Sequence, residues 1–455
     1  MLHARYSRLI PTGFLFGSLA ISLTHSALAD ERALHEIAAA PSAERIRQDI
    51  ETLVDFGTRH TLSETESDSR GIGAARRWIH DEFEQISRDC GGCLEVFYVS
   101  DFVGGEGRIP DPVEVVSVIA VQRGSRDPNR YVMMSGDIDS RVSDVMNATA
   151  DAPGANDNAS GMAGVIEAAR VLTQYEFDGS IVYAGLSGEE QGLFGGTIVA
   201  EHAREQGWKL DAVLNNDMIG NIRGINGVIN NTTARVFSEG TRAVETDEEA
   251  RQRRFQGGEV DSASRNLGRY IDALADRYIT SLDTMMIYRL DRFGRGGHHR
   301  PFNDAGYPAV RIMETNEHYH WQHQDVREED GIAYGDVIEH VDFDYAAKLT
   351  ALNAVTLASL AWAPAPPANV RIRGAVSPDT TLSWDEVPGA TGYRLHWRLT
   401  TDPQWRWSRD VGDVNEFMLE NVVIDNYFFG VSSLSGDGIQ SPVVFPGPAG
   451  AFPAP

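Results

Sequence analysis

The sequence predicts an α/β fold, in which a mostly parallel central sheet is flanked by helices and followed by a small all-β sandwich. Short apolar runs alternate with helical segments through most of the chain, a pattern typical of a parallel sheet covered on both faces. A proline-rich stretch follows, and after it come short strands with alternating polarity. At 455 residues the chain is long enough for more than one domain.

Within the α/β region, apolar residues at helical spacing predict amphipathic helices over 42–57 and 71–86. Short apolar runs predict strands over 113–122, 130–136, 179–186, 210–216 and 307–313, with helices over 159–175 and 195–206 between them. In such sheets ligands bind at the carboxyl ends of the strands. Functional residues are therefore expected directly after these strands.

The segment from Gly220 to Ser281 breaks the alternation, because it is charged and irregular apart from one helical pattern over 266–279. We interpret it as an insertion beside the site. It could form part of a pocket wall, although loop filler explains it equally well.

Residues 363–368 predict a linker between a larger domain over 30–362 and a smaller one over 369–447. The smaller domain contains Trp384, the stretch "GATGYRLHWR" and the ending "FFGVSSLSGDGIQSP". These features resemble a fibronectin type III domain, which implies a β-sandwich acting as a spacer or attachment module.

The first 29 residues predict a secretory signal peptide. Arg5 and Arg8 precede the apolar stretch "LIPTGFLFGSLAISL", and "ALA" at 27–29 supplies small residues for cleavage. The apolar stretch is short for a membrane span and contains proline and glycine, so cleavage is favoured over an uncleaved anchor. We expect an exported protein, periplasmic or extracellular, with no stable membrane span after processing.

The two cysteines, Cys90 and Cys93, lie close together in "DCGGC". In an exported protein such a pair can form a small disulfide loop, whereas a zinc site would need two further ligands nearby. A structural or incidental pair is favoured over a redox or zinc site.

The formal net charge of −26, with only two lysines, argues against nucleic acid as a partner, because no surface could bind phosphates. Acidic residues instead gather after predicted strands, in "SGDIDSR", "PGANDNASG", "LSGEEQGLFG" and "LNNDMIG". Each carboxylate alone could be a helix cap or a solvated residue. Together at one sheet edge they would repel each other unless cations neutralise them, which favours a metal site.

The motifs "GANDNASG", "SGEEQGLFGG" and "NNDMIG", in this order, resemble the co-catalytic di-zinc exopeptidases that include bacterial leucyl aminopeptidases, glutamate carboxypeptidase and the glutaminyl cyclases. The resemblance implies the zinc-exopeptidase type of fold over the larger domain. It implies that Asp157 bridges two divalent ions, that Glu190 and Asp217 each bind one of them, and that Glu189 is the general base. Two zinc ions about 3.5–4 Å apart could hold a bridging hydroxide and polarise the scissile carbonyl.

Two positions depart from the family pattern. The pattern opens with His-x-Asp-Ser, whereas this chain has Asp137 and then Asp139. Asp137 could still bind a metal through oxygen and would favour harder ions such as Mn²⁺, while Asp139 would orient a neighbouring ligand.

The second departure lies in "NEHYHWQHQDV", where the family has its last histidine ligand. Trp321 stands four residues before Asp325, so the resemblance favours His323 as the ligand, with His320 as the alternative. The stretch "RGGHHRPF" resembles the family's Asp-His-x-x-Phe, so His299 is a candidate pocket residue, with a structural role equally possible, and His298 replaces the Asp.

The sequence therefore predicts an exported metal-dependent exopeptidase, most simply an aminopeptidase acting on peptide or protein amino termini through a metal-bound hydroxide, with Glu189 as base. A carboxypeptidase or a glutaminyl cyclase on the same fold, or an inactive peptide-binding homologue, are the alternatives. The retained Glu189 and Glu190 argue against the inactive form. The oligomeric state is left open.

Overall fold

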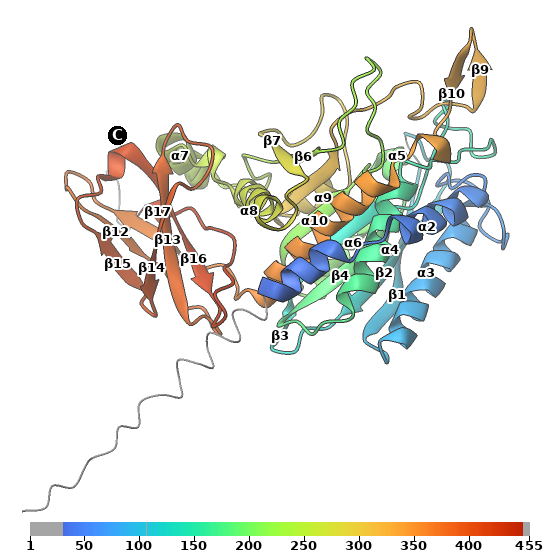
Figure 1. Ribbon diagram of the computed structural model, residues 1–455. Helices are drawn as coiled ribbons and strands as arrows, with labels where there is room; N and C mark the ends of the chain where they lie inside the picture. The colour runs from blue at the N-terminus through green and yellow to red at the C-terminus, as the bar shows by residue number, and fades with distance from the viewer. Residues whose placement is uncertain (1–30, 106, 449–455) are drawn as a thin grey trace, which may run out of the picture.

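The computed structural model describes residues 31–105 and 107–448. It contains a large α/β domain and a β-sandwich at the C-terminal side (Figure 1). The predicted signal peptide lies outside the described residues. Within the described part, no helix is both long enough and apolar enough to cross a membrane.

An eight-stranded mixed sheet forms the centre of the α/β domain, in the spatial order β1-β2-β4-β3-β5-β8-β6-β7. The strands are β1 (Leu94–Val103), β2 (Val113–Gln122), β3 (Asp127–Asp137), β4 (Gly179–Leu186), β5 (Lys209–Asn216), β6 (Thr233–Ser238), β7 (Asp283–Ile287) and β8 (Ala309–Glu314). The ladders β4-β3, β3-β5, β5-β8 and β6-β7 are parallel, and the others are antiparallel. The predicted α/β class is confirmed, and the carboxyl ends of β3, β4 and β5 meet at one edge.

Helices cover both faces of this sheet. Successive residues of a strand point to opposite faces, so the buried strands contribute apolar side chains to a core on each side. In β3, Val132 and Met134 belong to one core cluster and Met133 to the other. The first cluster joins the sheet to α2 (Ala43–Asp55), α3 (Gly71–Asp89), α4 (Ala159–Leu172), α8 (Ala263–Tyr278) and α10 (Phe343–Trp362). The second joins it to α6 (Phe194–Glu205) and α9 (His299–Asp304). The central strands are therefore buried on both sides, which fixes the loops at their ends.

The segment from Gly220 to Ser281 does more than the predicted insertion would. It contributes β6 to the central sheet, between β8 and β7, as well as the expected helix, which is α8. It also contains α7 (Asp247–Gln256), whose first turn is closed by a capping box between Thr246 and Glu249. The segment is thus an integral part of the α/β domain.

The C-terminal region is a β-sandwich. One sheet has the order β15-β12-β11-β17 and the other β14-β13-β16. The strands are β11 (Arg371–Arg373), β12 (Thr380–Ser383), β13 (Gly392–Leu399), β14 (Trp407–Gly412), β15 (Glu416–Leu419), β16 (Tyr427–Leu434) and β17 (Gly447–Pro448). Trp384, Tyr393 and Leu395 lie in its core. The fibronectin type III assignment and the domain boundaries stay predictions.

Buried polar contacts join the sandwich to α8. The Asp261 carboxylate lies 2.9 Å from Arg269 Nη1 and 2.7 Å from Arg398 Nη2, and all three side chains are almost completely buried. Arg269 Nε also donates to the carbonyl of Pro403 at 2.7 Å. These contacts position the sandwich against the α/β domain by specific charged groups.

Cys90 and Cys93 form a disulfide between α3 and β1. The structural pair favoured by the sequence is therefore confirmed, and neither thiol is free to bind zinc.

Candidate active site

The acidic motifs lie at the carboxyl edge of the sheet. Asp137 is the last residue of β3, Asp217 directly follows β5, and the short helix α5 (Glu189–Gly192) begins after β4. Gly188, just before α5, has a φ of 77°, a left-handed conformation that glycine adopts without steric cost. This turn brings Glu189 and Glu190 toward the cavity that lies beside the sheet edge.

Three side chains come together in a geometry that suits a metal ion. His323 Nε2 lies 2.8 Å from Asp157 Oδ2 and 2.8 Å from Glu190 Oε1. In the part of the chain that the structure describes, these residues are the one group of three or more His, Cys, Asp or Glu whose ligand atoms all lie within 4.8 Å of one another. One nitrogen and two carboxylate oxygens are the donors of a catalytic zinc site, which keeps a further position open.

The electrostatics of this group suit a cation. Burial lowers the pKa of His323, but the neighbouring Glu190 and Asp157 outweigh burial and raise that pKa to about 9. Burial raises the pKa values of Asp157 and Glu190, but His323 opposes it, so both pKa values lie below the usual range. The two carboxylates are thus ionised at neutral pH, with protonated His323 as their positive partner, and a zinc ion bound by the group would take over that positive charge.

Neighbouring side chains hold the three candidate ligands in place. Gln322 donates to Asp157 Oδ2 at 2.8 Å, and the Asp336 carboxylate accepts the backbone N–H of Asp157 at 2.7 Å. Arg141 donates to Glu190 Oε2 at 2.7 Å and lies 2.6 Å from His323 Nδ1. Such contacts fix the orientation of ligands and increase metal affinity.

Glu189 lines the same cavity, next in sequence to the candidate ligand Glu190. Burial, assisted by the nearby Asp217 and Glu190 charges, raises the pKa of Glu189 well above its ordinary value. A carboxylate with a raised pKa is a stronger base and a better proton carrier near neutral pH. The general-base role of Glu189 stays a prediction, and the structure shows this residue on the cavity wall.

Asp139 lies beneath α5, where it holds the backbone of both glutamates. Its carboxylate accepts the N–H of Glu189 at 3.2 Å and that of Glu190 at 3.0 Å. It also accepts the hydroxyl of Thr61 at 3.0 Å. The predicted orienting role of Asp139 thus corresponds to contacts with the backbone of α5.

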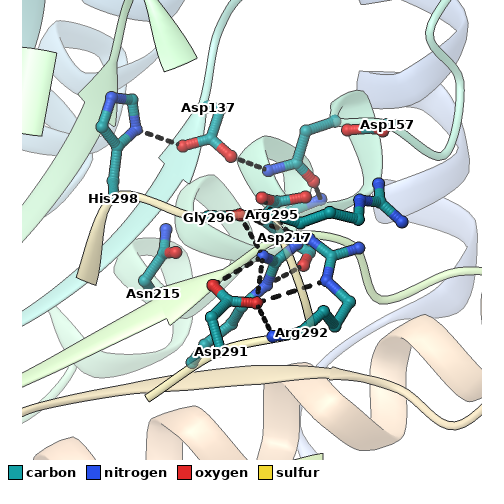
Figure 2. A network of polar contacts seen from close by, with 12 residues as sticks. Asp137, Asp157, Asn215, Asp217, Asp291, Arg292, Arg295, Gly296 and His298 are labelled. Atoms are coloured by element: carbon teal, nitrogen blue, oxygen red, sulfur yellow. Dashed lines mark hydrogen bonds and ion pairs between the residues drawn. The ribbon is translucent and has the colours of Figure 1, made fainter. Parts of the chain in front are cut away.

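Asp137 and Asp217 are held by other partners and do not join the three-residue group. Asp137 Oδ1 lies 2.5 Å from His298 Nδ1, a contact visible in Figure 2, and its Oδ2 accepts from Asn158 at 2.7 Å. Asp217 Oδ2 lies 2.8 Å from Arg311 Nη2. The expected second set of ligands, Asp137 with Asp157 and Asp217, is therefore not assembled around a common point.

The other predicted histidines lie away from this group. His320 packs its ring 4.9 Å from that of Tyr334, and His299 Nε2 lies 2.8 Å from the carbonyl of Leu290. Trp321 stacks between His318 and His340, with ring centroids 3.7 Å apart on each side. Of the two candidate ligands in this loop, His323 lies beside Asp157 and Glu190, whereas His320 packs against Tyr334.

Sequence reasoning missed several arginines around the site. A cavity of about 610 Å³ lies beside Glu189 and His323. Five arginines contribute to its wall: Arg108, Arg141, Arg292, Arg295 and Arg300. Arg141 directly follows the Asp-x-Asp-Ser motif, and Arg311 interrupts an apolar strand, so both positions carried a signal in the sequence.

Comparison with known proteins identifies the family. The model of Peptidase family M28 matches residues 117–343. A probable zinc metalloprotease of Pyrenophora teres f. teres is 42% identical over 413 residues, which cover 90% of this chain and 85% of the relative. The chain belongs to peptidase family M28. This M28 chain is also 43% identical over 410 residues to a probable zinc metalloprotease of Leptosphaeria maculans. The match covers 90% of this chain and 95% of the relative.

Solved structures show the same fold at low sequence identity. The LapA aminopeptidase of Legionella pneumophila superposes with a TM-score of 0.53 and 21% identity, over 73% of this M28 chain and 75% of that one. A glutaminyl cyclase of Macrostomum lignano superposes with a TM-score of 0.50 and 14% identity, over 71% of this chain and 90% of that one. The family and its zinc peptidase chemistry agree with the resemblance seen in the motifs.

Proposed function

We propose that this chain is an exported zinc exopeptidase of family M28 that removes residues from the amino terminus of peptides. The observation that carries the proposal is the position of Glu189 beside the group of Asp157, Glu190 and His323, on the wall of an open cavity. A zinc ion bound by these three residues would polarise the carbonyl of the scissile peptide bond.

The residues of the chain supply the proton transfers. Glu189 accepts a proton from the attacking water and returns it to the leaving amine, a task that its raised pKa favours. Asp139 keeps Glu189 and Glu190 in position through their backbone N–H groups. Asp217 also lines the cavity, where an acidic side chain suits a free amino terminus.

The test compares Glu189→Gln with wild type in zinc content and in hydrolysis of aminoacyl-anilides. The variant should keep its zinc, because Glu189 lies outside the three-residue group, and should lose about 10²–10⁴-fold in kcat. Equal rates for the two proteins would remove the peptidase assignment and favour the inactive homologue. Absence of zinc that cannot be restored by dialysis against zinc would do the same.

A carboxypeptidase is the second candidate, because one observation favours it. The overall charge of the chain is −26, yet five arginines line the cavity. Of these, Arg292 and Arg295 are paired with Glu317, at 2.7 Å and 2.6 Å. Guanidinium groups bind carboxylates well, so the same wall could receive a free carboxyl terminus.

Two blocked substrates separate these candidates. A tripeptide amide with a free amino terminus should be cleaved from its first residue, whereas its N-acetylated counterpart with a free carboxyl terminus should be inert. Cleavage of the acetylated peptide alone would assign a carboxypeptidase.

Export is also proposed, from the first 29 residues of the sequence. Amino-terminal sequencing of the protein recovered outside the cytoplasm should find Asp30 first. An intact leader on protein that stays inside the cell would contradict export.

A further inference from the structure

The resemblance to the di-zinc exopeptidases implies a second ion, but the residues that would hold it are engaged elsewhere. We propose that the guanidinium of Arg311 replaces the second metal ion, so that this chain binds a single zinc ion at Asp157, Glu190 and His323. The inference rests on the proposed zinc site and concerns the position beside it, where Asp137 and Asp217 lie.

Arg311 is built into this position by the fold. It lies in β8, which pairs with β5 so that Arg311 is opposite Asn215, two residues before Asp217. Its side chain is completely buried. Nη2 lies 2.8 Å from Asp217 Oδ2, and Nε donates to the backbone carbonyl of Asp217 at 2.6 Å. One arginine thus hydrogen-bonds to the main chain of the residue expected to bind the second ion and forms an ion pair with its carboxylate.

A second carboxylate fixes the other side of the guanidinium. Arg311 Nη1 lies 3.1 Å from Asp291 Oδ2 and also donates to the carbonyl of Gly296. Figure 2 shows Asp217, Asp291 and Gly296 gathered in one network of contacts. An arginine guanidinium does not lose its proton in proteins, so the group stays charged. The cation is therefore permanent and is held from several directions.

The other expected ligand, Asp137, is occupied as well. Its two oxygens contact His298 Nδ1 at 2.5 Å and Asn158 Nδ2 at 2.7 Å. The sequence departs from the family pattern at both ends of the first contact, with Asp137 in place of a histidine and His298 in place of an aspartate. The two departures thus contact each other in this chain, and both oxygens of Asp137 are engaged by His298 and Asn158.

A divalent ion cannot be added here without displacing what is present. A divalent ion bound by Asp217 would lie next to the Arg311 guanidinium, which cannot lose its proton. The two positive charges would repel each other strongly in a buried site. Removing Arg311 from Asp217 and Asp291 would leave buried charges without a partner, which is unfavourable. The second position is accordingly closed by the chain itself.

The wild-type protein provides the first test. After loading with excess zinc and desalting, elemental analysis should give one zinc per chain, and zinc-edge anomalous diffraction should give one peak, next to His323 Nε2. Two ions per chain, or a peak within bonding distance of Asp137 or Asp217, would overturn the proposal. No zinc at all would refute the proposed function itself, so the two failures are distinguishable.

Two variants test whether Arg311 is the cause. Asp137→His combined with His298→Asp restores the family pattern but keeps Arg311, and it should still bind one zinc. Addition of Arg311→Met should raise the content to two zinc ions per chain. A second ion in the double variant, or only one in a triple variant whose circular dichroism matches wild type, would show that Arg311 does not take the place of an ion.

Discussion

Replacement of Asp139 by asparagine tests how the turn that carries the two glutamates is held. Asp139 accepts the N–H of Glu189 and of Glu190 on separate oxygens, and the hydroxyl of Thr61 on one of them. Asparagine has one carboxamide oxygen, so one backbone N–H of α5 must face an NH₂ group. Asp139→Asn therefore keeps the size of the side chain and removes one of its two backbone contacts.

The expected cost follows from these contacts. A hydrogen bond to a charged group contributes about 1.5–3 kcal/mol, and a neutral one about 1 kcal/mol. One such bond is lost and the other becomes neutral. Burial and repulsion from Glu190 raise the pKa of Asp139, so its neutralisation returns part of this loss. We expect a net destabilisation of about 1–3 kcal/mol and, because α5 carries both glutamates, a loss of about 10–100-fold in kcat or zinc affinity.

Urea unfolding, zinc titration and aminoacyl-anilide kinetics measure these effects. Asp144→Asn is the matched control, because Asp144 is exposed and, among the residues that the structure describes, its side chain accepts only the N–H of Met146, a contact that asparagine retains. The control should match wild type in all three measurements. A folded Asp139→Asn protein with wild-type kinetics and zinc affinity would show that Asp139 does not position α5.

Three further predictions concern stability. Asp261→Asn should cost about 3–5 kcal/mol in urea unfolding, because it leaves the buried Arg269 and Arg398 without a carboxylate; an unchanged midpoint would refute this. Burial raises the pKa of Glu239 from 4.5 to about 7, so its contribution to stability is lost as the pH rises through 7. The Tm of Glu239→Gln should therefore exceed that of wild type at about pH 9, and by a smaller amount at about pH 5. A Tm difference that does not depend on pH would contradict the raised pKa of Glu239. Chelation of zinc should lower Tm, because it removes about 2.7 kcal/mol of stabilisation if the ion was present at about a hundredfold excess over its Kd, and re-addition of zinc should restore Tm.

The sequence predicted the buried strands well and the outer strands poorly. Strands β2 to β5 and β8 are apolar runs, because helices cover both of their faces. Strand β1 was missed, because it lies at the sheet edge and most of its side chains are partly or fully exposed. Strand β7 was missed for the same reason, since it forms the other edge and its side chains are partly or fully exposed, and β6 lies in the segment that was interpreted as an insertion. Apolar patterning reports burial, so it fails where one face is open to solvent.

The site divides in a similar way. Asp157 and Glu190 follow from motifs at the starts of the helices α4 and α5, which the buried strands position. The choice between His320 and His323 could not be made firmly from the sequence, because both lie in one loop without a regular backbone. His323 has a φ of 57°, a left-handed conformation that is uncommon outside glycine and marks a constrained position. That backbone geometry, which no residue pattern predicts, accompanies the position of its imidazole beside Glu190.

Asp137 raised the question of whether an unusual carboxylate could still bind a metal, and the contacts around it give a different answer. Taken alone, Asp137 and His298 are two unrelated departures from the family pattern, 161 residues apart in the chain. In the structure they contact each other, and Arg311 contacts Asp217. Each carboxylate expected to hold the second ion thus has a partner supplied by the chain. Arg311 carries a permanent charge in the middle of a buried strand, a position where charge is expensive unless it is paired. The ion pairs with Asp217 and Asp291 offset the cost of burying that guanidinium. In return, the guanidinium reduces the negative charge around Asp217, as a second metal ion would have done.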